Sequence, residues 1–170
     1  MRATRFHQRL YGSIVTVLKR AVAGLLFLLL FTVVWGVITR FLFGDQSSWT
    51  EETAIYLLIW VSLAGAPLAY AENGHLGVDY FFNKWGPETQ RLARLFSHLL
   101  TALFAGAGLL FGGLGLVLET AAAGQVSPAT GTPTAIVYLA IPLSGAFFLF
   151  FALSFSLTAP EEASPPRPSR

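Results

Sequence analysis

Four long apolar stretches constrain the fold of this chain more than any other feature of its sequence. Each has 19 residues or more and contains no Asp, Glu, Lys or Arg; they are residues 21–39, 53–71, 95–118 and 134–159. A helix rises about 1.5 Å per residue, so 19 residues cover about 28 Å, close to the bilayer hydrocarbon thickness of about 30 Å. Backbone groups in lipid must pair within the protein, and these stretches are too long for barrel strands. The sequence therefore predicts an all-α membrane protein with four transmembrane helices.

The composition excludes several other classes of protein. Charged residues make up 12% of the 170 residues, whereas a soluble domain has about a quarter. The chain contains no Cys, which excludes a disulfide framework, a thiolate metal site and a Cys nucleophile. His75 and Asp79 lie four residues apart, but a surface hydrogen bond explains that spacing better than a metal site, because no second ligand pair accompanies them. We therefore expect no enzymatic activity, no metal, no bound cofactor and no nucleic-acid partner.

The basic residues predict the orientation of the chain. With four spans, ten of the 11 Lys and Arg residues fall on one side and only Arg40 on the other. By the positive-inside rule, both termini are predicted to be cytoplasmic. We divide the chain into a basic cytoplasmic arm (1–20), a four-helix transmembrane domain (21–159) and a Pro-rich cytoplasmic tail (160–170) that we expect to be disordered. The first stretch continues without a small-x-small cleavage site, so we interpret it as an uncleaved anchor.

Two spacings in the sequence predict helix surfaces. Val78, Phe81, Phe82 and Trp85 recur at i, i+3, i+4 and i+7, which indicates a short amphipathic helix at the cytoplasmic interface. In the third stretch, small residues recur at helical spacing and allow close approach of another helix; they are Ala105, Gly108, Gly112 and Gly115. We expect this stripe to serve packing within the chain, with a homodimer face as the alternative.

The lack of charge inside the stretches also bears on function. Carriers that move ions or charged substrates by themselves usually hold ionisable residues within the membrane. This chain is therefore not expected to form the transport pathway. Two alternatives stay open: a haem-bearing membrane anchor of a redox complex that uses His7, His75 or His98, and a homo-oligomeric channel built on the small-residue stripe.

A set of motifs between the first and third stretches resembles a known family. The motifs are Arg40-Phe41, Trp49-Thr50-Glu51-Glu52, Trp60, Gly65-Ala66, His75 and Val78-Asp79, followed by Tyr138-Leu-Ala-Ile-Pro142-Leu in the last stretch. Their order and spacing resemble the small membrane subunit, the DctQ-type subunit, of tripartite ATP-independent periplasmic (TRAP) transporters. The length, the four spans and the inward termini agree with that resemblance.

The resemblance implies a role in Na⁺-coupled uptake of an organic acid across the bacterial inner membrane. In that family a periplasmic substrate-binding protein delivers the substrate to two membrane subunits, and the large multi-span permease subunit holds the sodium and substrate sites. The small subunit is a non-catalytic scaffold that braces the large one and helps to dock the binding protein. The resemblance marks candidate subunit-contact residues: Arg40, Trp49, Glu51, Glu52, Trp60, His75 and Asp79. It does not name the transported compound, which other chains would recognise.

Overall fold

The computed structural model describes residues 2–44, 47–73 and 87–158. The predicted amphipathic helix at Val78–Trp85, the candidate residues His75 and Asp79, and the tail 160–170 lie outside the described residues. For these segments the expectations stay predictions.

The described residues form helices and no strand. In chain order they are α1 (Arg2–Phe43), α2 (Ser48–Asn73), α4 (Pro87–Leu103), the π-helix η1 (Phe104–Gly112), α5 (Gly113–Ala122), α6 (Thr134–Tyr138) and α7 (Ala140–Thr158). They include four segments long and apolar enough to cross a membrane, namely Leu10–Leu42, Ser48–Glu72, Phe96–Ala122 and Thr134–Ser154. The predicted all-α membrane protein with four spanning helices is confirmed. α1 already begins at Arg2, so the basic arm is a helical continuation of the first span.

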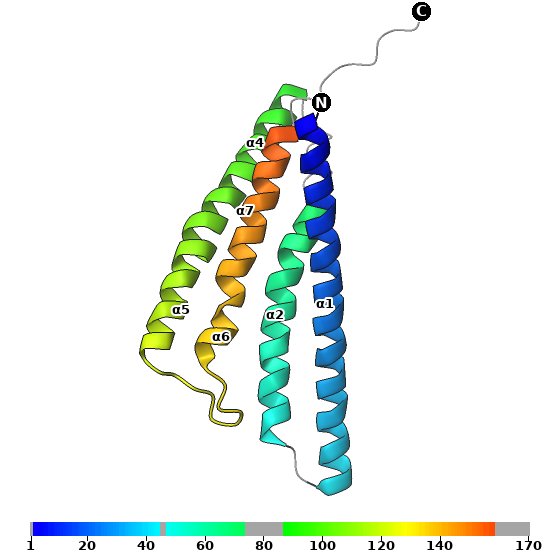
Figure 1. Ribbon diagram of the computed structural model, residues 1–170, viewed down its shortest axis with the longest axis vertical. Coiled ribbons are helices and arrows are strands. Elements are labelled where there is room, and N and C mark those ends of the chain that lie inside the picture. Colours follow the sequence, from blue (N-terminus) through cyan, green and yellow to red (C-terminus); the bar gives the residue numbers. More distant parts are fainter. Residues whose placement is uncertain (1, 45–46, 74–86, 159–170) are drawn as a thin grey trace, which may run out of the picture.

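α7 lies in the middle of the molecule (Figure 1). It packs between α2 on one side and α4 with η1 on the other, whereas α1 packs mainly on α2. In an apolar 18-residue stretch of the span that contains α7, 39% of the residues are buried, against 6–11% in the corresponding stretches of the other three spans. α1 begins and α7 ends at the same end of the molecule, which we call the terminal end. The end of α1, the start of α2 and residues 123–133 lie at the opposite end, which we call the loop end.

The third span contains a π-helical segment that changes which small residues face α7. Hydrogen bonds in a π-helix run from i to i+5, so the side-chain register shifts relative to an α-helix. Gly113 is buried, and a Cβ there would lie 2.8 Å from Ile141 Cγ2. Gly108 and Gly112 are exposed instead. The expectation that the stripe packs within the chain was therefore wrong at Gly108 and Gly112, because it assumed an unbroken 3.6-residue period; the homodimer alternative stays a prediction.

The fourth span is interrupted once, at Leu139, between α6 and α7. Pro142 lacks the N–H that would otherwise bond the carbonyl of Tyr138, so the helix is weakened at this point. The neighbouring bonds survive: the Leu139 N–H donates to the Ala135 carbonyl at 3.1 Å, and the Leu143 N–H to the Leu139 carbonyl at 3.3 Å. Helical hydrogen bonding thus continues on both sides of Leu139.

Candidate functional site

Glu52 joins α2 to the connection that precedes α6. One of its carboxylate oxygens accepts a hydrogen bond from the Thr130 N–H at 2.9 Å, and the other accepts one from the Tyr56 hydroxyl at 3.3 Å. The Ser127 hydroxyl also hydrogen-bonds this carboxylate and lies 2.9 Å from the Thr130 hydroxyl. Hydrogen bonds to a charged acceptor are stronger than neutral ones. Glu52 therefore holds the loop end of this chain together.

The connection that Glu52 holds is itself ordered by backbone hydrogen bonds. The Ser127 N–H donates to the Thr132 carbonyl at 2.9 Å, and the Gly131 N–H donates to the Ser127 carbonyl at 3.0 Å. Gly131 has a φ of +66°, a conformation that glycine adopts without the strain of a Cβ. The turn thus aims the Thr130 N–H at α2.

Glu51 lies on a different side of α2 from Glu52. It lines a groove of about 300 Å³ between α1 and α2, and Arg40 lines the same groove. Arg40 is in the last turn of α1 and Glu51 in the first turn of α2, where each charge complements its own helix dipole. Both side chains are exposed, and no ion pair joins them among the described residues. These two charges are available at the surface of the loop end, whereas Glu52 is engaged within the chain.

The floor of this groove is a close contact between α1 and α2. Thr50 is 2% exposed, and its hydroxyl donates to the Ser47 carbonyl. A Cβ added at Gly36 would lie 3.1 Å from the Thr50 hydroxyl oxygen. Trp49, one residue earlier, is 46% exposed. Arg40 and Glu51 thus share a groove built on a tightly packed helix pair, and Trp49 is exposed at the same end of the molecule.

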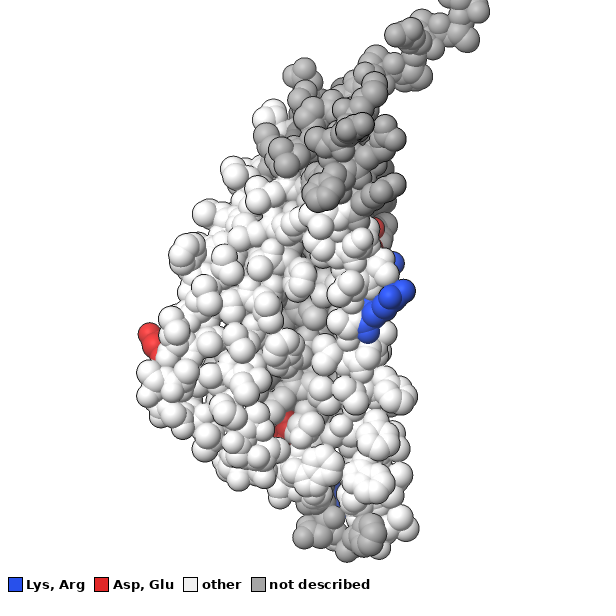
Figure 2. Space-filling model, in the orientation of Figure 1, with Lys and Arg blue, Asp and Glu red and all other residues white. Residues whose placement is uncertain are grey.

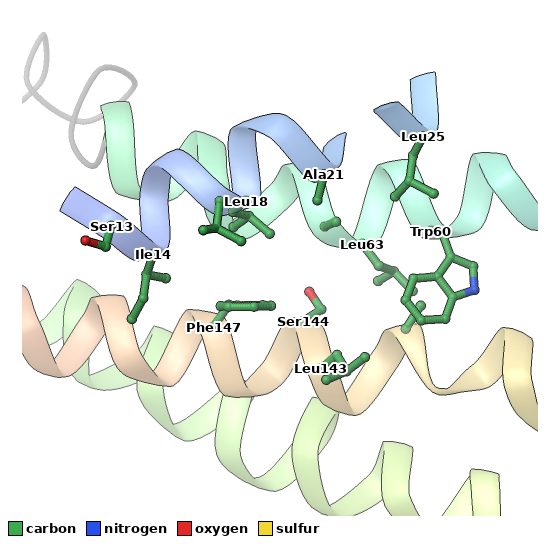
Figure 3. A pocket seen from close by; sticks show the side chains of 13 residues that line it. Ser13, Ile14, Leu18, Ala21, Leu25, Trp60, Leu63, Leu143, Ser144 and Phe147 are labelled. Carbon is green, nitrogen blue, oxygen red and sulfur yellow. The ribbon is translucent and has the colours of Figure 1, made fainter. Parts of the chain in front are cut away.

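Trp60 lies away from this region and faces the interior of the chain. It lines a half-open cavity of about 340 Å³ between α1, α2 and α7. Figure 3 shows Trp60 and Leu25 at one end of the cavity, and Ser13 and Ile14 at the other. The structure therefore separates Trp60 from Arg40 and Glu51, which line the other groove.

A second set of polar contacts ties the helices together toward the terminal end. Lys19 of α1 forms an ion pair with Glu72 of α2. The Tyr11 hydroxyl donates to the Ala71 carbonyl at 2.9 Å, and Tyr70 and His98 are hydrogen-bonded through Oη and Nδ1 at 2.6 Å. His98 is 7% exposed. Its Nδ1 is engaged with Tyr70, which joins α2 to α4.

Charged side chains are absent from the described interior. The buried polar and charged residues are Thr32, Thr50, His98, Thr120, Ser127, Ser144 and Ser154, so none is Asp, Glu, Lys or Arg. On the face shown in Figure 2, charged side chains are few and lie apart. No group of three or more His, Cys, Asp or Glu residues that could hold a metal is found in the described part of the chain. No Asp, Glu, Lys or Arg side chain is therefore buried between the described helices.

Three residues that contact Glu52 were not expected from the sequence: Tyr56, Ser127 and Thr130. The contact between Tyr56 and Glu52 could have been predicted, because Tyr56 follows Glu52 by four residues on the same helix face. Thr130 is 78 residues from Glu52 and donates through its backbone. Nothing in the local sequence indicates such a contact.

Comparisons with known proteins agree with the geometry. Residues 29–159 match the family described as Tripartite ATP-independent periplasmic transporters, DctQ component. The chain is 30% identical over 107 residues to the C4-dicarboxylate TRAP transporter small permease protein DctQ of Rhodobacter capsulatus, covering 63% of this chain and 47% of that protein. It is 35% identical over 69 residues to the sialic acid TRAP transporter small permease protein SiaQ of Vibrio cholerae, covering 41% of this chain and 39% of that protein.

A third relative is a longer protein. The chain is 29% identical over 128 residues to the isethionate TRAP transporter permease protein DctMQ of Oleidesulfovibrio alaskensis, covering 72% of this chain and 20% of that protein. The matched part of this chain covers less than half the length of each of the three relatives.

Proposed function

The chain belongs to the DctQ component family of the tripartite ATP-independent periplasmic transporters, and from this premise we propose that it is the small, non-catalytic membrane subunit of such a transporter. In this role it braces a large permease subunit and helps to receive a substrate-binding protein. Members of this family are transporter components and not enzymes.

The observation that carries the proposal is the uncharged interior. Carriers that move ions or charged substrates by themselves usually hold ionisable residues within the membrane, and the buried residues in the described part of the chain include no Asp, Glu, Lys or Arg. A scaffold needs only rigid helices and surfaces for a partner. The pathway and the sodium coupling are therefore assigned to the partner subunit.

The longer relative supports a permease partner. In DctMQ of Oleidesulfovibrio alaskensis, the matched segment is 20% of a single permease protein. A segment that is joined to a permease in one protein is well suited to bind a permease as a separate chain in another.

The relatives are named for C4-dicarboxylates, sialic acid and isethionate, which are all organic acids, and we extend that substrate class to the complex that contains this chain.

The loop end is the proposed docking surface for the binding protein. The excess of Lys and Arg near the termini favours a cytoplasmic terminal end, so the loop end faces the periplasm of a bacterial inner membrane. Arg40, Trp49 and Glu51 are exposed there. Glu52 contributes to this surface indirectly: its carboxylate accepts a hydrogen bond from the Thr130 N–H and so fixes the connection before α6.

Reconstituted uptake tests this proposal. The chain is combined in vesicles with its large permease subunit and substrate-binding protein, and labelled substrate uptake is measured under a sodium gradient. We expect uptake to be lost when the chain is omitted. Undiminished uptake without the chain would overturn the scaffold role.

Two neighbouring carboxylates provide a matched pair for the docking surface. Glu51→Gln removes an exposed charge, whereas Glu52→Gln alters a charge engaged within the chain. We expect Glu51→Gln to raise the binding-protein concentration needed for half-maximal uptake, with an unchanged amount of membrane complex. An unchanged concentration dependence for Glu51→Gln would remove it from the docking surface.

A further inference from the structure

The cavity between α1, α2 and α7 has a composition that suits an acyl chain. Its volume is about 340 Å³, and its lining is apolar except for Ser13 and Ser144. An apolar cavity of about 150 Å³ stays dry in water and accepts a guest the size of benzene. The cavity here is about twice as large and half open, and it lies in a part of the chain that spans the membrane.

The cavity is elongated along the helices. Its lining on α1 runs from Ser13 to Leu25, which corresponds to about 18 Å at 1.5 Å per residue. Figure 3 shows the lining residues of α1 and α7 following one another along the two helix axes. A long, narrow guest such as a hydrocarbon chain fits this shape better than a compact one.

One polar group inside the cavity has no partner. Ser144 is 2% exposed, and its hydroxyl has no hydrogen bond among the described residues. Figure 3 shows this hydroxyl turned toward α1, between the levels of Phe147 and Leu143. A buried hydroxyl without a partner costs free energy. An acceptor such as the ester carbonyl of a lipid would remove that cost.

A basic side chain without an ion pair to any described carboxylate, that of Arg20, lies beside the open side of the cavity. Val17 lines the cavity but is 65% exposed, so it marks the mouth. Ser13, Val17 and Arg20 follow at i, i+4 and i+7, which places Arg20 on the same helix face as the mouth. Lys19 is paired with Glu72, whereas Arg20 is exposed and forms no ion pair with any described carboxylate. Figure 2 shows a small blue area at one edge of an otherwise largely uncharged face.

From these observations we propose that the cavity between α1, α2 and α7 is a specific seat for one acyl chain of an anionic glycerophospholipid. The phosphate binds Arg20, the ester carbonyl accepts a hydrogen bond from Ser144, and the acyl chain runs along Leu25 toward Trp60. The lipid comes from the leaflet at the terminal end. It fills a space that the chain's own side chains leave empty, and so joins α1 to α7. This site does not depend on the transport role.

Fluorescence quenching of Trp60 tests lipid binding in this cavity, because Trp60 lines it. The full chain is prepared with Trp60 as its single tryptophan through Trp35→Phe, Trp49→Phe and Trp85→Phe, and it is placed in phosphatidylcholine vesicles. Phosphatidylglycerol with a dibrominated acyl chain is added at low mole fraction, and brominated phosphatidylcholine is the comparison. We expect about fivefold stronger apparent binding of the anionic lipid, the order expected for one basic residue at an anionic surface.

Matched variants separate the two halves of the site. Arg20→Gln should remove the preference for phosphatidylglycerol, whereas Arg40→Gln, at the other end of the same helix, should keep it. Ala21→Leu places extra carbons in the cavity and should reduce quenching by both lipids to the level expected for bulk contact. Ala23→Leu, on α1 outside the cavity lining, should leave quenching unchanged.

Three outcomes would overturn the proposal. Equal quenching by the two lipids, together with no effect of Arg20→Gln, would remove the headgroup contact. Undiminished quenching in Ala21→Leu would place the acyl chain elsewhere. Loss of the excess quenching when the large permease subunit binds would assign the cavity to a helix of that partner.

Discussion

Ser144 and Gly145 are neighbours on α7, yet they face two differently packed sides of the molecule. Gly145 faces the third span, where an added Cβ would lie 2.8 Å from Leu109 Cβ and 2.8 Å from the Leu110 nitrogen. Ser144 faces α1 and α2, where a cavity of about 340 Å³ remains. One side of α7 leaves no room for a methyl group, and the other leaves room for a ligand.

This difference follows from how helices associate in lipid. Lipid tails are as apolar as the side chains, so burial alone does not drive helices together, and close van der Waals packing has to do so. Glycines at 113 and 145 permit that packing between α7 and the third span. On the other side, Leu18, Phe147 and Trp60 line the cavity that remains between the helices. The glycine contacts therefore predict which helix pair is rigid and which can open.

The largest expected effect comes from filling the tight side. Gly145→Ala places a Cβ against backbone atoms that cannot rotate away, so we expect the free energy of unfolding to fall by about 2 kcal/mol. Unfolding in mixed micelles measures this change. Gly115→Ala is the control, since a Cβ there meets nothing within 4 Å. Equal stabilities of the two variants would contradict the tight packing of α7.

A smaller loss is expected where α1 meets α2 at the loop end. Gly36→Ala brings a Cβ to 3.1 Å from the Thr50 hydroxyl oxygen, but that side chain can shift its rotamer at a cost of about 1 kcal/mol. Gly24→Ala, in the same helix with open space around it, should cause no loss. The same unfolding assay compares them. A loss as large as that of Gly145→Ala would show that the α1–α2 pair is equally rigid.

A change of opposite sign is expected on the open side of α7. In lipid-depleted protein, Ser144→Ala removes an unpaired hydroxyl and should raise the free energy of unfolding by up to about 1 kcal/mol. Ser154→Ala is the matched change, because the Ser154 hydroxyl donates to the Phe150 carbonyl at 2.7 Å. That variant should lose stability. A loss in both serine variants would show that Ser144 has a hydrogen-bond partner.

The smallest effect on global stability is expected for Glu52→Ala. This change removes the acceptor for the Thr130 N–H, so amide exchange should speed up in residues 123–133 while the spans stay protected. Hydrogen–deuterium exchange with mass spectrometry measures it. Glu51→Ala should leave that segment unchanged, because Glu51 lines the α1–α2 groove. Equal acceleration by both variants would contradict the separation of the two carboxylates.

The sequence predicts much of the fold, because length and hydropathy alone determine whether a helix can cross a bilayer. The four spans, and the position of Arg40 and Glu51 at facing helix ends, follow from local patterns. The register of the third span does not. Its π-helical segment, Phe104–Gly112, has no marker in composition, and it places Gly113 rather than Gly112 against α7.

The division of labour among the candidate residues could not be predicted either. Glu51 and Glu52 are adjacent in sequence and equal in charge, yet one is exposed and the other bonds a backbone N–H 78 residues away. Trp60 lies among the same motifs but lines a cavity far from the loop end. Such roles depend on which helices meet, and no local pattern of one sequence records that.

The central claim is that this chain works as a scaffold within a larger membrane complex, and co-purification tests it most directly. The tagged chain is isolated from mildly solubilised native membranes, and the proteins bound to it are identified and quantified by mass spectrometry. The account predicts a large multi-span permease subunit at a ratio near one to one. Recovery of the chain alone, or with redox subunits, would contradict it.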